Sequence, residues 1–181
     1  IYGDLDPELL PATEDVPIAP LSPYGASKYT VEQYLGVYSR THDLAFTSLR
    51  LPNVYGPRQD PRGEAGVVAI FFKKMIADEP ITVFGDGLSS RDYTHVSDVA
   101  EAFLKSAGLP GNNTVNIGTG VDTTVLDLVR YMSEIIGYER QPTFAPLRIG
   151  EVAKISLDAT RAAREIMWTP SHDLEAGLRN T

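Results

Sequence analysis

A tyrosine and a lysine four residues apart give this chain its clearest chemistry. Tyr24 and Lys28 follow a Ser-Pro pair and enclose three small residues, 25–27. Pro23 suits the first turn of a helix, and the residues after it favour helix. Residues four apart on a helix share a face, so the ammonium of Lys28 would lie beside the phenol of Tyr24. Because a nearby cation stabilises a phenolate, the pair could act as a general base, and the lysine could also hold a ribose hydroxyl.

The sequence around this pair predicts a helix, then a strand, then a loop at the end of that strand. The helix should run from Pro23 to about residues 40–43, with apolar residues at helical spacing. The apolar run 44–51 follows and is expected to form a buried parallel strand. It leads directly into a loop that contains Pro52 and Asn53. Open α/β sheets bind ligands beyond the carboxyl ends of their strands, so this loop is a candidate site by position alone.

The rest of the chain alternates helices and strands, which predicts an α/β fold. Residues 4–22 are rich in proline and acidic residues and are expected to lack regular structure. A helix should begin at residues 63–68 and end near Ala77, and an edge strand should follow it at residues 81–84. We expect Ser97 or Asp98 to cap the next helix, and Thr123-Thr124 to cap one that ends near Ile136.

Composition excludes several classes of function. With 181 residues, the chain can form one large domain or a domain with a subdomain. Its net charge is −8 and it has no basic stretch, so we expect no nucleic-acid partner. The absence of cysteine excludes disulfides and thiolate metal sites, and three scattered histidines predict no metal. No apolar run is long enough for a transmembrane helix, so we expect no membrane partner and a cytoplasmic location.

The Tyr24–Lys28 stretch and two later motifs resemble those of a known family. These motifs are residues 91–99 (Arg-Asp-Tyr-Thr-His-Val-Ser-Asp-Val) and residues 148–151 (Arg-Ile-Gly-Glu). Together they resemble the extended short-chain dehydrogenase/reductase family, the NAD-dependent epimerases and dehydratases. Within that family they are most similar to the 4-epimerases of UDP-glucose and UDP-galactose, which work through a 4-keto sugar.

The resemblance implies only the C-terminal part of a Rossmann-type parallel sheet, plus a small α/β substrate-binding subdomain. It makes residues 1–60 a remnant of the NAD-binding domain, and residues 61–181 mainly the sugar-nucleotide subdomain. A strand and helix at about residues 92–120 would return to the Rossmann part. The N-terminal βαβ units would be missing, because no glycine fingerprint for a dinucleotide pyrophosphate follows a strand in this sequence. We therefore expect a fragment that is inactive alone, with the family's catalytic Ser or Thr about two residues before Ile1.

The resemblance also implies a role for each candidate residue. Tyr24 and Lys28 would be catalytic and would contact NAD together with Leu51 and Pro52. Seven residues would bind a UDP-sugar, namely Asn53, Val67, Val68, Phe84, Arg91, Arg148 and Glu151. Asn53 would reach the sugar, the amides of Val67 and Val68 the pyrophosphate, and Phe84 the uracil.

Two arginines and a glutamate would bind the rest of the nucleotide. The guanidinium groups of Arg91 and Arg148 would bind phosphate oxygens, and Glu151 would accept hydrogen bonds from ribose hydroxyls. We expect Asp92 to hold Arg91 in place, and His95 to be structural.

Several alternatives stay open from the sequence. A nucleotide-sugar 4,6-dehydratase, a UDP-glucuronate decarboxylase or a glucuronate epimerase would share these motifs, although Gly25 favours an epimerase. The chain could also be a non-catalytic UDP-sugar-binding or interaction module. The resemblance further implies a homodimer through the Tyr24 helix, and half a parallel sheet would expose apolar surface that favours self-association.

Overall fold

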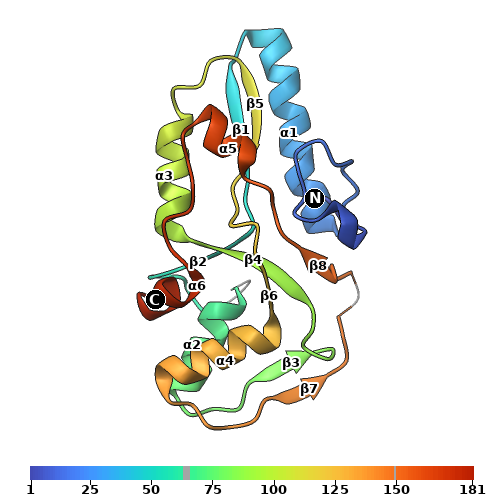
Figure 1. Cartoon of the computed structure of the whole chain (residues 1–181). Coiled ribbons are helices and arrows are strands. Elements are labelled where there is room, and N and C mark those ends of the chain that lie inside the picture. The colour runs from blue at the N-terminus through green and yellow to red at the C-terminus, as the bar shows by residue number, and fades with distance from the viewer. Residues whose placement is uncertain (63–65, 149) are drawn as a thin grey trace.

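The computed structural model describes residues 1–62, 66–148 and 150–181 and has an α/β fold with parallel strands in two parts (Figure 1). One part contains β1 (Phe46–Arg50) and β5 (Asn112–Asn116), which pair in parallel from Phe46↔Asn112 to Arg50↔Asn116. Around them lie α1 (Pro23–His42), α3 (Val96–Ser106) and α5 (Thr160–Glu165). The predicted parallel strand after the Tyr24 helix is thus confirmed.

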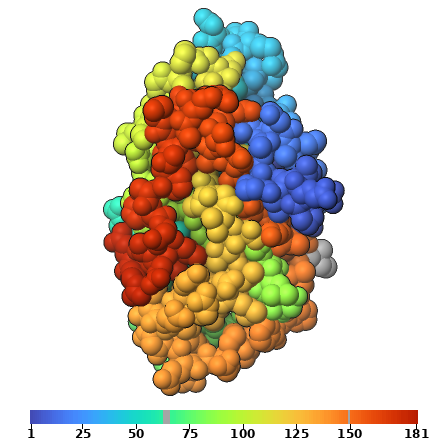
Figure 2. All heavy atoms as spheres, in the orientation of Figure 1, coloured from blue at the N-terminus to red at the C-terminus, as the bar shows by residue number. Residues whose placement is uncertain are grey.

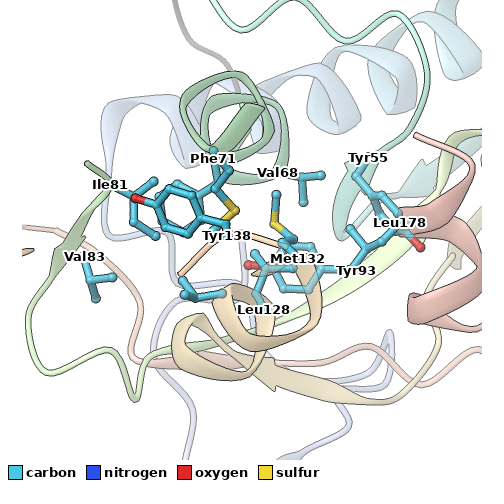
Figure 3. Packing of buried hydrophobic residues seen from close by; sticks show 12 residues of the cluster. Tyr55, Val68, Phe71, Ile81, Val83, Tyr93, Leu128, Met132, Tyr138 and Leu178 are labelled. Carbon is cyan, nitrogen blue, oxygen red and sulfur yellow. The ribbon is translucent and has the colours of Figure 1, made fainter. Parts of the chain in front are cut away.

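The second part holds two further sheets and three helices. Its central strand β4 (Ser90–His95) pairs with β2 (Asn53–Tyr55), β6 (Asp122–Thr124) and β8 (Lys154–Ile155), while β3 (Thr82–Phe84) pairs with β7 (Thr143–Ala145). The helices are α2 (Val67–Ile76), α4 (Val125–Ile136) and α6 (Leu174–Arg179). Figure 3 shows the core between them, where Phe71, Leu128 and Met132 pack with residues of β2, β3 and β4.

The C-terminal segment connects the two parts. In the space-filling view it runs from α5 to α6 over one face of the molecule (Figure 2). Trp168 is fully buried against α3, and its indole Nε1 donates to the carbonyl oxygen of Asp98 at 2.8 Å. The Asp98 carboxylate also accepts from the backbone and the ring Nδ1 of His172. Although burial acts to raise the pKa of Asp98, hydrogen bonds from Ser171 and His172 hold it below its usual value.

The helix ends follow the local sequence in most cases. Ser22 caps α1 by accepting from the amide of Gly25 at 3.1 Å, and the helix ends where Asp43 adopts a left-handed conformation. Thr124 caps α4 in the same way, as predicted. The predicted cap of α3 was wrong, because His95 caps that helix through its Nδ1 and the amide of Ser97.

The irregular segments differ from the prediction in small ways. Residues 4–22 are mostly irregular, as predicted, but include one turn of 3-10 helix (Pro7–Leu9) and a bridge from Ala12 to Leu157. Asn53 was predicted in a loop and lies instead in β2, opposite Tyr93. The start predicted at residues 63–68 lies partly outside the described residues, and α2 itself ends at Ile76. No helix in the described ranges is long and apolar enough to cross a membrane.

Candidate functional site

The Tyr24–Lys28 pair lies on an exposed face of α1. The ammonium Nζ of Lys28 is 5.0 Å from the centroid of the Tyr24 ring, so the helix brings the two groups together. The Tyr24 side chain is 65% exposed. Both groups are therefore accessible to a ligand that would lie along this face.

Leu51 and Pro52 form the link between the two parts of the fold. They follow the last residue of β1, Arg50, and precede Asn53, the first residue of β2. Leu51 is 39% exposed. This link is at the carboxyl end of a parallel strand, where open α/β sheets bind ligands.

A pocket of about 460 Å³ lies in the second part of the fold. Six of the seven residues predicted to bind the substrate line it, namely Asn53, Val67, Phe84, Arg91, Arg148 and Glu151. They come from five separate stretches of the chain, so the fold brings together residues that the sequence keeps up to 98 positions apart (53 to 151). Their shared location is a finding, whereas their roles toward a ligand stay a prediction.

The seventh residue, Val68, points elsewhere. Its side chain is 2% exposed and packs in the core beside Phe71 (Figure 3). It lies at the start of α2, directly after Val67, where the first backbone amides of a helix have no acceptor within the helix. Only the backbone of Val68 could therefore take the predicted role toward a pyrophosphate.

Arg91 is held by backbone carbonyl groups at the edge of the pocket. Its Nη1 donates to the carbonyl oxygens of Ser90 at 2.8 Å and of Ala153 at 3.4 Å. Arg91 is half-buried, and its side chain lines the pocket. These two contacts hold the Nη1 group of Arg91, while the other N–H groups of its guanidinium can donate to a ligand.

The expectation that Asp92 holds Arg91 was wrong. Successive side chains of a strand point to opposite faces, so Asp92 faces away from the pocket. Its carboxylate accepts from the amides of Thr119, Gly120 and Leu157 and from the Thr119 hydroxyl. It is 1% exposed, and burial raises its pKa. Asp92 thus joins three segments of the fold rather than orienting a ligand.

Arg148 and Phe84 form a stacked pair in the pocket. The guanidinium carbon of Arg148 is 3.9 Å from the centroid of the Phe84 ring, a cation–π contact. One face of Phe84 is therefore covered by Arg148. A base that stacks on Phe84 would have to use the other face or displace the arginine.

The pocket has a cationic lining that favours a diphosphate. Among its described lining residues, Lys74, Arg91 and Arg148 carry positive charge, and only Glu151 carries negative charge. Lys74 is not among the residues that the sequence predicted for the site. Its spacing from Val67, seven residues or about two turns, was the signal that it shares a helix face with a predicted site residue.

The described residues contain no cluster of three potential metal ligands among His, Cys, Asp and Glu side chains. His95 lies 1% exposed beside His172, with ring centroids 4.3 Å apart. Burial lowers the pKa of His95, and its Nδ1 serves as the cap of α3. The cap through Nδ1 fits the predicted structural role, whereas the buried Nε2 has no hydrogen-bond partner among the described residues.

Comparison with known proteins places these features in a family. Residues 1–118 match the NAD dependent epimerase/dehydratase family. The chain is 41% identical to the UDP-glucose 4-epimerase of Mycolicibacterium smegmatis over 182 aligned positions, which cover 100% of this chain and 58% of that protein. It thus spans less than two thirds of the curated relative.

Two solved structures are similar over the whole chain. A UDP-glucose 4-epimerase from Thermotoga maritima, solved with UDP-glucose, has a TM-score of 0.96 at 46% identity and matches over 58% of its own length. A UDP-glucose 4-epimerase from Thermus thermophilus, solved with NAD, has a TM-score of 0.90 at 39% identity and matches over 59%. Both matches cover 100% of this chain.

Proposed function

The chain belongs to the NAD-dependent epimerase/dehydratase family, and on that premise we propose that the protein carrying it is a UDP-sugar 4-epimerase of the UDP-glucose and UDP-galactose type. The observation that carries the proposal is the pocket that gathers six residues predicted to bind a nucleotide sugar. Solved relatives with UDP-glucose and with NAD support it.

The pocket would bind the nucleotide part of the substrate. Arg91 and Arg148 would donate hydrogen bonds to the diphosphate, and Lys74 would add a third positive charge. Glu151 would accept from ribose hydroxyls. Asn53 lines the pocket and directly follows the Leu51–Pro52 link in the chain, and it would orient the sugar.

The catalytic group would be Tyr24. Its phenolate would remove the proton from the sugar C4 hydroxyl and later return it, while the Lys28 ammonium stabilises the phenolate charge. The reaction would pass through a 4-keto sugar, whose other face then receives the hydride. Bound NAD would supply the hydride chemistry.

The residues present fit one end of NAD. An exposed phenol and ammonium on α1 offer hydrogen-bonding groups for a nicotinamide ribose. The 181 residues contain no strand–turn–helix glycine fingerprint for the pyrophosphate. We therefore propose that residues 1–60 are the portion of an NAD-binding domain that carries the base, and that residues 61–181 mainly bind the sugar nucleotide, with about 92–120 returning to the first unit.

We also propose that two copies associate through α1. None of its twenty residues, all within the described part of the chain, is buried, and Val31, Tyr34 and Tyr38 are each at least 50% exposed. An apolar helix face of this kind favours self-association. Light scattering would detect the dimer, and a monomer at all concentrations would contradict it.

A cytoplasmic location, which rests on composition alone, completes the proposal.

The test is the identity of the product. The NAD-loaded protein is expected to convert UDP-galactose to UDP-glucose, and the isolated 181-residue chain to give no turnover because it lacks the pyrophosphate-binding turn. A 4-keto-6-deoxy sugar as product would instead support a 4,6-dehydratase. Turnover by the isolated chain would contradict its proposed inactivity.

A further inference from the structure

Helix α1 is attached to the fold mainly through polar side chains. The whole helix lies in the described part of the chain, and none of its residues is buried. It packs beside β1, and the hydrogen bonds between the two elements end on one residue of the helix, Glu32. A helix that does not contribute to an apolar core depends on such contacts for its position.

Glu32 forms a two-pronged ion pair with Arg50. Its Oε1 accepts from the Nε of Arg50 at 2.9 Å and from the Ser48 hydroxyl at 3.0 Å, and its Oε2 accepts from Arg50 Nη2 at 2.8 Å. The Arg50 and Glu32 side chains are only 10% and 13% exposed. A planar guanidinium fork on a carboxylate fixes direction as well as distance. Together with the hydrogen bond from Asn112 of β5 to the Ser39 hydroxyl, this contact sets the rotation and the height of α1 on the sheet.

Arg50 is itself held from the other side. Its Nη1 donates to the Tyr2 hydroxyl at 2.8 Å, and that hydroxyl donates to Oδ1 of Asn116 at 2.7 Å. Asn116 is the residue opposite Arg50 in the β1–β5 pair. Although burial acts to raise the pKa of Glu32, the hydrogen bonds from Arg50 hold it below its usual value. The Arg50 guanidinium is thus held to the β1–β5 sheet through Tyr2 and Asn116, and Glu32 holds α1 to the guanidinium.

The ion pair joins α1, which carries Tyr24 and Lys28, to β1, which leads along the chain to Asn53. Tyr24, Lys28 and Glu32 are spaced by four, so they form one stripe along α1. On the other side, Arg50 precedes Asn53 by three residues, which can span at most about 11 Å. The pair therefore connects the helix that carries the base to β1, the strand that precedes Asn53 and the pocket in the chain.

We propose that Glu32 and Arg50 are positioning residues that hold the Tyr24–Lys28 pair over the substrate; this rests on the proposed function. Neither residue lines the pocket. Their loss is expected to disturb the base and not the nucleotide site. A misplacement of about 1 Å at a reacting group can cost about 100-fold in rate.

The test compares Glu32→Gln with Glu134→Gln in the NAD-loaded protein. Glu134 also pairs with an arginine on a helix, but its side chain is 60% exposed and does not line the pocket. We expect Glu32→Gln to lower kcat about 100-fold while KM for the UDP-sugar and Kd for UDP stay within about twofold. Glu134→Gln should match the wild type. Ser48→Ala removes one of the three hydrogen bonds to Glu32 and should lower kcat by a smaller factor. This variant still tests the proposal if the Glu32→Gln protein does not fold.

Hydrogen exchange supplies a readout that does not depend on activity. In the Glu32→Gln chain, exchange should rise in residues 23–42 and stay unchanged in α2 and α4. Equal losses of kcat, UDP affinity and thermal stability would overturn the positioning role and show a general weakening of the fold. Unchanged exchange in α1 would also overturn it. Absence of turnover in the wild type would count against the proposed function alone, because the exchange result still decides the role of the pair.

Discussion

Replacing Tyr24 with phenylalanine is expected to lower the rate of epimerisation by about 100- to 10,000-fold in the NAD-loaded protein, the range that general acid–base groups contribute. The substitution removes only a hydroxyl from a side chain that is 65% exposed, so the fold should not change. The Tyr24 residue does not line the nucleotide pocket. The Kd for UDP should therefore be unaltered, which steady-state kinetics and a UDP titration on the same samples would check.

A matched variant separates the base from its surroundings. Tyr34→Phe removes the same hydroxyl from another exposed tyrosine of α1, 60% exposed, and should retain wild-type turnover. If Tyr24→Phe kept more than about a tenth of the wild-type rate, the base would have to be another group.

The largest expected effect on stability is that of Asp92→Ala. The change would leave the backbone amides of Thr119, Gly120 and Leu157 without their acceptor, the first two in a part-buried and the third in a buried place. An unsatisfied buried donor costs about 1–3 kcal/mol and a part-buried one costs less, so we expect a total loss of about 3 kcal/mol in the free energy of unfolding. For a chain of this length that corresponds to a fall in Tm of roughly 6–12 °C.

Asp15→Ala is the control for this prediction. Asp15 also makes an ion pair, with Arg161, but its side chain is 84% exposed. Its removal should cost about 1 kcal/mol or less. Thermal unfolding followed by circular dichroism would compare the two, and equal small shifts would show that the Asp92 cluster contributes little to stability.

Local sequence signals predicted the helices and strands well where one residue type decides the outcome. Pro23 begins α1 because the first turn does not need its missing N–H, and Thr124 begins α4 because its side chain accepts from an amide of the first turn. The short strands β2, β6, β7 and β8 were missed, since two or three residues leave no readable alternation.

Individual residues of the candidate site could be predicted from the sequence, but the contacts that these side chains make could not. Motif residues such as Arg91 and Arg148 could be recognised individually, and the fold places them in one pocket. The partners of Asp92 and Glu32 could not be predicted, because each lies 16 to 65 positions away in the sequence. The Arg148–Phe84 stack was missed for the same reason.

The central claim, that the pocket is a nucleotide-sugar site, is tested most directly by titrating UDP into the 181-residue chain by calorimetry, with Arg148→Ala as comparison. We predict micromolar binding to the wild type that UDP-glucose competes away. Arg148→Ala should weaken it by about 10- to 100-fold, the worth of a charge-assisted hydrogen bond. No detectable binding of UDP at millimolar concentration to the folded chain would contradict the account.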